Sequence, residues 1–219
     1  MKIGSDGSRR PAFRHGSGQA VFLDRDGTMI EDIGYLERLE QIDFYPWTVD
    51  AVRALNRAGL AVVVITNQAG IARGYFTEAF VDETHRAVSA RLEAGGAHVD
   101  AYYYCPHHPD GTLEAYRKRC DCRKPARGLI DRAVADLGID PERSFMVGDK
   151  WLDVGAGRAA GARSILVRTG LGTLQEARPH PEFAADAVVD NLAAAVSWIF
   201  LHLRSADRVI GEVDRQSPI

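Results

Sequence analysis

The chain has 219 residues, which is enough for one domain with a sizeable hydrophobic core. It carries 27 basic and 30 acidic residues, a formal charge of −3, without a long run of either sign. Because nucleic-acid binders and membrane-surface binders need a basic face, this balance argues against both classes.

The two ends of the chain differ in composition from its centre. Residues 1–18 are rich in Gly, Ser and Arg and lack an apolar stretch, which predicts a flexible tail and not a signal peptide. The apolar segment 193–203 has eleven residues and is too short to span a bilayer, so it predicts a docked helix. We therefore expect a single domain at 19–204, a C-terminal tail at 205–219, a cytoplasmic location and a monomer.

Strand and helix patterns alternate along the chain. The predicted strands are 20–24, 60–66, 99–104, 144–148, 163–168 and 187–189. The predicted helices are 48–58, 77–94, 127–137, 153–161 and 190–204. This βαβ alternation predicts an α/β fold with a doubly wound, mostly parallel, Rossmann-like sheet. The stretch 105–125 fits no regular element and is longer than an ordinary connection, so we expect it to be functional or held by something other than a core.

Two carboxylates follow the first predicted strand, Asp24 and Asp26, with Gly27 directly after them. Ligands of open α/β sheets bind at the carboxyl ends of the strands. Strand alternation predicts that Asp24 and Asp26 point the same way and that Arg25 points the other way. Two like charges this close need a compensating proton or cation, and Mg²⁺ prefers carboxylate oxygens. The pattern alone also fits a solvated acidic turn.

Polar residues follow two further predicted strands. Thr66 begins a turn of small and polar residues, which can bind phosphate oxygens through the hydroxyl and backbone N–H groups, or can simply be a polar turn. Asp149 supplies a third carboxylate at the same sheet edge and can complete a metal site. Asp153 can instead cap the following helix.

All three cysteines fall within residues 105–122. Cys105 and His107 form one close pair, and Cys120 and Cys122 form another after twelve intervening residues. Two close pairs of soft or borderline ligands suit a tetrahedral structural Zn²⁺ site. An odd cysteine count fits disulfides poorly, whereas ordinary buried thiols and His108 as the fourth ligand remain alternatives.

Arg123 and Lys124 come directly after the last of these cysteines, so a metal-held loop would aim two cations at an anion. Together with the strand ends, this arrangement suits phosphoryl transfer. Asp24 is placed to attack phosphorus, and Asp26 to protonate the leaving oxygen and later deprotonate water. Lys124 and Thr66 would bind the non-bridging oxygens. Mg²⁺ would be held by Asp24, Asp149 and, through its backbone carbonyl, Asp26.

These motifs resemble those of the haloacid-dehalogenase-like phosphatases, from the Asp-Arg-Asp-Gly-Thr of 24–28 through Thr66 and Lys124 to Gly148-Asp149 with Asp153. Four longer segments are similar to the branch that acts on heptose bisphosphates, and the resemblance covers about residues 20–190. These segments are 66–78, 103–109, 120–125 and 146–150.

This resemblance implies a fold without a large cap domain, with Zn²⁺ on Cys105, His107, Cys120 and Cys122. It implies catalytic roles for Asp24, Asp26, Thr66 and Lys124. The residues that match substrate-contacting positions are Asp32, Ile33, Gly34, Tyr35, Thr66, Asn67, Gln68, Ala69, Arg123, Lys124 and Lys150.

The implied reaction is Mg²⁺-dependent removal of the 7-phosphate of D-glycero-D-manno-heptose 1,7-bisphosphate in ADP- or GDP-heptose biosynthesis. Histidinol phosphate or another small sugar phosphate is the alternative substrate, and the turn 69–74 with Arg123 favours the heptose. A non-catalytic zinc-binding module would explain the cysteines but not Asp24, Asp26 or Lys124.

Overall fold

The structure is a computed structural model that describes residues 18–213, with the side chains of residues 18–203. The predicted N-terminal tail lies outside the described residues except for Gly18, and so does the segment 214–219 of the predicted C-terminal tail.

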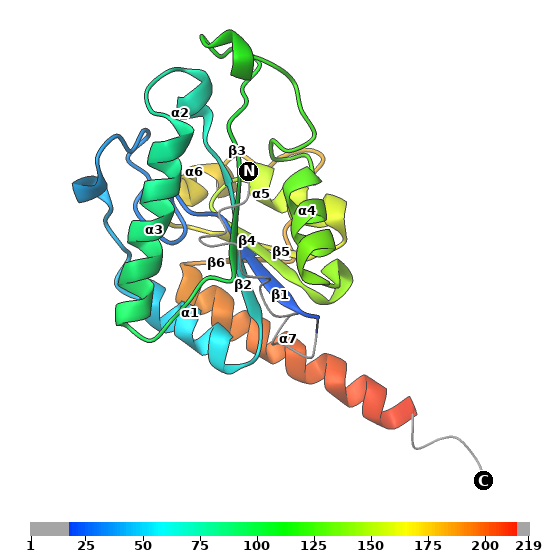
Figure 1. The fold of residues 1–219 in the computed structure, drawn as a ribbon. Coiled ribbons are helices and arrows are strands. Elements are labelled where there is room, and N and C mark those ends of the chain that lie inside the picture. Colours follow the sequence, from blue (N-terminus) through cyan, green and yellow to red (C-terminus); the bar gives the residue numbers. More distant parts are fainter. Residues whose placement is uncertain (1–17, 214–219) are drawn as a thin grey trace.

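Six parallel strands form one sheet in the order β3-β2-β1-β4-β5-β6 (Figure 1). The strands are β1 (Ala20–Leu23), β2 (Ala61–Asn67), β3 (Ala101–Cys105), β4 (Phe145–Gly148), β5 (Arg163–Val167) and β6 (Ala187–Val189). Each begins or ends within two residues of its predicted position. The predicted α/β, parallel, doubly wound architecture is confirmed.

The helices are α1 (Thr48–Arg57), α2 (Ala69–Ala72), α3 (Glu78–Ala94), α4 (Gly128–Leu137), α5 (Trp151–Ala160), α6 (Gly172–Glu176) and α7 (Leu192–Val213). Short 3-10 turns lie at Leu39–Gln41, Glu114–Tyr116 and Pro141–Arg143. The sequence patterns missed α2 and α6, because helices of four and five residues are too short to show a 3.6-residue period. The turn at Glu114–Tyr116 corrects the expectation that the stretch 105–125 lacks regular structure.

Helix α7 continues to Val213, nine residues beyond its predicted end at 204. The prediction followed the apolar segment, but no proline or glycine interrupts the chain between residue 204 and Gly211. Among the helices of residues 18–213, none is long and apolar enough to cross a membrane.

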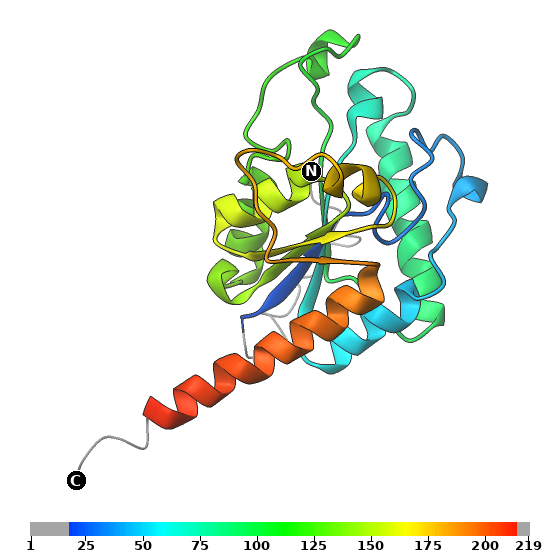
Figure 2. The same ribbon diagram turned by 180° about the vertical axis from the view of Figure 1, so that it is seen from behind.

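Alternate residues of the strands contribute to two cores, one on each face of the sheet. Val21 and Leu23 of β1 pack into the core formed with α1, α3 and α7. Ala20 and Phe22 pack into the core formed with α4 and α5. Figures 1 and 2 show the sheet between these two helical layers. Because both faces are covered, the central strand β1 is apolar throughout, as in other buried parallel sheets.

The sheet brings the ends of its central strands to one edge. Leu23 at the end of β1 pairs with Val64 of β2 on one side and with Val147 of β4 on the other. The long loop after β3 and helix α2 rise above this edge (Figure 1). Within residues 18–213, loops rather than a separate domain therefore border the carboxyl ends of the strands.

Candidate active site and cysteine cluster

Three buried carboxylates meet at the ends of β1 and β4. Oxygen atoms of Asp24, Asp149 and Asp153 all lie within 4.8 Å of one another. Asp153 also accepts a hydrogen bond from the backbone N–H of Lys150 at 3.0 Å. Lys150 is the N-cap of α5, so Asp153 stands at N3 of a capping box and not at the predicted N-cap, because the helix begins two residues earlier than predicted. The second oxygen of Asp153 faces Asp24 and Asp149. Asp153 is therefore a candidate metal ligand in addition to the predicted ligands Asp24, Asp149 and the Asp26 carbonyl.

Two lysines compensate this negative charge. Lys124 Nζ is 2.8 Å from Asp24 Oδ1, pairs with Asp153, and donates to the carbonyl of Ile65 at 2.8 Å. Lys150 Nζ is 3.2 Å from Asp149 Oδ1 and 2.9 Å from Asp32 Oδ2. The three carboxylates of the cluster and Asp32 therefore share two ammonium groups.

The two lysines do not lower the pKa values of the three carboxylates equally. Burial raises the pKa of Asp24, but the charges of Lys124 and Lys150 outweigh burial and hold this pKa below its ordinary value. Burial raises the pKa of Asp149 to about 7; Lys150 opposes the shift, and the nearby carboxylates of Asp24 and Asp153 add to it. The pKa of Asp153 is also raised, chiefly by burial. A divalent cation would remove this conflict, and the three carboxylates fit the oxygen ligands that Mg²⁺ prefers.

Two glycines allow the backbone to approach Asp149 closely. A Cβ atom at Gly27 would lie 2.3 Å from Asp149 Oδ2, and one at Gly170 would lie 2.4 Å from it. The backbone N–H of Leu171 donates to the same oxygen at 2.8 Å. This loop after β5 was not predicted, although Gly170 and Gly172, shortly after a strand, were a usable signal.

Asp26 has different partners from Asp24. Arg25 Nε and Nη2 lie 3.1 and 3.0 Å from its two oxygens, and Gln68 Nε2 donates to Oδ2 at 2.9 Å. Gln68 Nε2 is also 2.9 Å from Thr66 Oγ1. The expectation that Arg25 points away from Asp26 is wrong, because β1 ends at Leu23 and strand alternation does not extend into the turn. The predicted metal contact of the Asp26 carbonyl stays a prediction.

A pocket lies beside Asp26. Five predicted substrate contacts line it, namely Gly34, Tyr35, Asn67, Gln68 and Ala69. The sequence missed four further lining residues, Arg25, Leu36, Gly70 and Phe76. Of the other predicted contacts, Thr66 lies behind Gln68, Asp32 and Lys150 lie at the carboxylates, and Ile33 is exposed.

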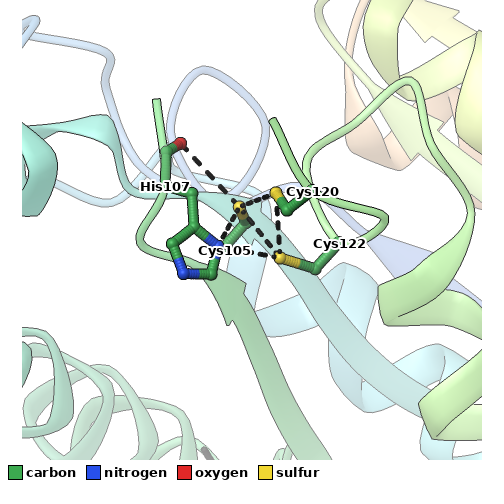
Figure 3. A group of neighbouring side chains, drawn as sticks. All are labelled: Cys105, His107, Cys120 and Cys122. Atoms are coloured by element: carbon green, nitrogen blue, oxygen red, sulfur yellow. Dashed lines mark hydrogen bonds between the residues drawn. The ribbon is translucent and has the colours of Figure 1, made fainter. Parts of the chain in front are cut away.

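The cysteines and His107 form a compact group (Figure 3). The three sulfur–sulfur distances are 3.2, 3.3 and 3.5 Å, and His107 Nδ1 lies 3.3 Å from Cys122 Sγ and 3.8 Å from Cys105 Sγ. In a tetrahedral site with Zn–S bonds of about 2.3 Å, sulfur atoms lie about 3.8 Å apart. The four side chains therefore fit Zn²⁺ after a small expansion. His108, the alternative ligand, instead accepts a hydrogen bond from the Asp110 N–H.

This group connects the long loop to the carboxylate site. Arg123 Nη1 donates to the carbonyl of His107 at 3.3 Å. The next residue, Lys124, exchanges two backbone hydrogen bonds with the side chain of Asn67, at 3.1 and 3.2 Å. The cysteine group and the end of β2 thus fix the backbone on both sides of the cations that the sequence singled out.

Comparisons with known proteins place the chain in a family. A family model described as "HAD-hyrolase-like" matches residues 121–195. The D-glycero-beta-D-manno-heptose-1,7-bisphosphate 7-phosphatase of Salmonella typhi is 45% identical over 181 residues, which are 82% of this chain and 94% of that protein. The protein of the same name from Haemophilus influenzae is 41% identical over 173 residues, 78% of this chain and 94% of its own. The chain belongs to the heptose-bisphosphate phosphatase family of HAD-like hydrolases.

Solved structures agree with this membership. The D,D-heptose 1.7-bisphosphate phosphatase of B. bronchiseptica, complexed with magnesium and phosphate, matches with a TM-score of 0.75 and 31% identity. The match covers 84% of this chain and 99% of that one. The resemblance inferred from the motifs is therefore confirmed. That solved member of the family was therefore crystallised with magnesium. This chain has a cluster of three carboxylates suited to the same metal and a cluster of three cysteines and one histidine suited to zinc.

Proposed function

We propose that this chain is a Mg²⁺-dependent phosphatase that removes the 7-phosphate of D-glycero-β-D-manno-heptose 1,7-bisphosphate. The observation that carries the proposal is the separation of two carboxylates in one turn: Asp24 lies in the buried cluster beside Lys124, whereas Asp26 borders the pocket. The names of the relatives support the substrate and its β anomer.

In the first step, Asp24 is the nucleophile. Lys124 and Lys150 keep its carboxylate ionised despite burial, and an ionised oxygen can attack phosphorus. A bond forms between Asp24 and phosphorus as the bond from phosphorus to the sugar oxygen breaks. Asp26 gives a proton to this leaving oxygen. Bound Mg²⁺ would supply charge neutralisation at the phosphoryl group, held by Asp24, Asp149 and Asp153.

In the second step, the aspartyl-phosphate on Asp24 is hydrolysed. Asp26, now ionised, takes a proton from water, and the resulting hydroxide oxygen bonds to phosphorus. The bond between phosphorus and Asp24 breaks, which frees inorganic phosphate and restores the carboxylate. Thr66 and Lys124 hold the non-bridging oxygens in both steps.

The pocket and the loop above it would select the sugar. Tyr35, Asn67 and Ala69 line the pocket. Arg123, which is bonded to His107, and Lys150, which pairs with Asp32, would supply positive charge to the substrate. We further propose that the chain acts as a cytoplasmic monomer in ADP- or GDP-heptose biosynthesis, and that it binds neither nucleic acid nor a membrane.

A phosphate-release assay in Mg²⁺ tests the proposal. It compares both anomers of the heptose bisphosphate with histidinol phosphate and fructose 1,6-bisphosphate, and ³¹P NMR identifies which phosphate is lost. We expect the highest kcat/KM for the β anomer, with a heptose 1-phosphate as product. A higher kcat/KM for histidinol phosphate would reject the substrate, and no release from any of the four would reject the activity.

A further inference from the structure

Arg25 is a buried cation beside the proposed acid/base. Its side chain is 2% exposed, and its guanidinium forms a fork with both oxygens of Asp26, at 3.1 and 3.0 Å. Burial of a guanidinium is costly unless the group is paired and hydrogen-bonded. Among the side chains of residues 18–203, Asp26 is the carboxylate that forms an ion pair with it.

Two neighbouring features support the pairing of Arg25 with Asp26, namely the fixed backbone of the turn and the neutral ring of His85. The backbone carbonyl of Arg25 accepts hydrogen bonds from the N–H groups of Met29 and Ile30 at 2.9 and 3.1 Å, which fixes the turn. His85 packs nearby, and burial followed by the charge of Arg25 holds the pKa of His85 well below its ordinary value. The imidazole is therefore neutral near pH 7 and places no second cation beside Arg25.

The fork leaves Asp26 facing the pocket. The Asp26 side chain is 23% exposed, lines the pocket, and receives a third hydrogen bond from Gln68. A bidentate guanidinium–carboxylate pair fixes the plane of the carboxylate as well as its position, which a single ammonium contact does not do. Small displacements of a reacting group are costly, about 100-fold in rate for about 1 Å.

We propose that Arg25 is the positioning residue of Asp26, and that proton transfer to the leaving oxygen depends on this fork. The inference rests on the proposed function, because it gives Asp26 the acid/base role. Arg25 also lines the pocket, but its Nε and Nη2 donors are directed at the Asp26 carboxylate. It acts by holding the Asp26 carboxylate in place at the wall of the pocket.

The test uses substrates that differ in their need for a proton. A sugar alkoxide leaves poorly unless protonated, whereas 4-nitrophenolate leaves without protonation. In Arg25→Met we expect kcat for the heptose bisphosphate to fall by roughly 10- to 100-fold with little change in KM. The pre-steady-state burst of 4-nitrophenolate from 4-nitrophenyl phosphate, which reports the first step alone, should stay within about twofold.

The chain offers a matched control and a milder variant. Arg127 forms a similar fork with Asp131, at 2.8 and 3.0 Å, on the exposed surface of α4, so Arg127→Met should leave both rates unchanged. Arg25→Lys keeps the buried charge without the fork. Its kcat for the heptose bisphosphate should fall less than that of Arg25→Met, and its 4-nitrophenolate burst should again be nearly unchanged. This variant decides the test if Arg25→Met does not fold.

Equal losses on both substrates would overturn the proposal, because they would indicate a general structural role. No loss on either would also overturn it. In an Asp26→Asn background, Arg25→Met should lower the sugar-phosphate rate no further, and an additional tenfold loss would contradict the dependence. The unsubstituted protein could release 4-nitrophenolate without hydrolysing the heptose bisphosphate. That result would reject the proposed substrate but not the role of Arg25. The same comparison is then made with the primary alkyl phosphate that the protein hydrolyses fastest.

Discussion

Asp24 and Asp149 carry the same functional group within one cluster, yet their surroundings shift their pKa values in opposite directions. Asp24 is bonded to Lys124, and its pKa is lowered. Asp149 is buried among other carboxylates, and its pKa is raised to about 7. The same cluster thus contains an ionised nucleophile and a carboxylate that favours a proton or a metal ion.

Asp24→Asn should abolish turnover, by at least about 1,000-fold, because an amide cannot form the aspartyl-phosphate. Phosphate release under saturating Mg²⁺ measures the loss. Zinc content and the far-ultraviolet circular dichroism spectrum should be unchanged, since Asp24 lies outside the cysteine group. Retained turnover would contradict the covalent mechanism.

Asp149→Asn should raise the stability of the metal-free protein. The pKa of Asp149 is raised to about 7 in the folded protein, from about 3.9 in an unfolded chain. Ionised Asp149 therefore opposes folding as pH rises through this range. The gain should be absent below about pH 4, grow up to about pH 7, and remain constant above it, reaching at least about 1 kcal/mol.

Urea unfolding of the metal-free proteins measures this gain in stability. Thermal unfolding with and without Mg²⁺ measures how much the metal stabilises each protein. Mg²⁺ should raise the melting temperature of the unsubstituted protein more than that of the variant, because the variant lacks one charged ligand. A variant less stable than the unsubstituted protein at pH 8 without metal would contradict the account.

At the scale of elements, the long loop after β3 is held at several points along its length. Cys105, at the end of β3, is joined through the cysteine group to Cys120 and Cys122. Tyr116 in the middle of the loop donates to Glu78 of α3 at 2.7 Å. The loop has little apolar core of its own, so its order depends on these contacts.

Removal of zinc should lower kcat by about 10-fold or more at saturating Mg²⁺, because Arg123 and Lys124 directly follow a cysteine of the group. Chelation followed by elemental analysis defines the zinc-free sample, and steady-state kinetics measure the loss. Added Zn²⁺ should restore the rate. Unchanged kinetics in a verified zinc-free sample would show that the loop positions these cations without metal.

The strands and long helices were predictable because burial leaves a direct trace in the sequence. A strand covered on both faces is a continuous apolar run, as in β2. The fork between Arg25 and Asp26 was not predictable, because it forms in a turn where neither strand nor helix periodicity applies. Asp153 shows a related limit. One of its oxygens accepts from the Lys150 N–H at the start of α5 and the other faces the cluster, whereas sequence spacing indicated only a capping role.

At the scale of the whole molecule, His85 makes the free energy of unfolding depend on pH. Its ring stacks on Tyr102 of β3 with centroids 4.4 Å apart, and it is buried between α3 and the sheet. Burial holds its pKa well below the ordinary value, which is about 6.5. Protonation therefore favours the unfolded chain as pH falls below about 6.5.

The free energy of unfolding should accordingly fall by up to about 1.4 kcal/mol per pH unit below pH 6.5 through this single group. His85→Phe should show a smaller pH dependence between pH 7 and 5 than the unsubstituted protein. His98, which is half exposed, provides the control as His98→Phe. Equal slopes in the His85 variant and the unsubstituted protein, measured by urea unfolding, would refute this assignment.

The two hydrogen bonds between Asn67 and Lys124 have an evolutionary consequence. They attach the reacting end of the loop to the central sheet, whereas the segment between His107 and Cys120 is attached to α2 and α3, through Leu113 and Tyr116. We therefore expect insertions or replacements in that outer segment to leave the lysine beside Asp24 in place. The fold therefore separates a stretch in which new substrate preferences can arise from the stretch that must stay constant for chemistry to occur.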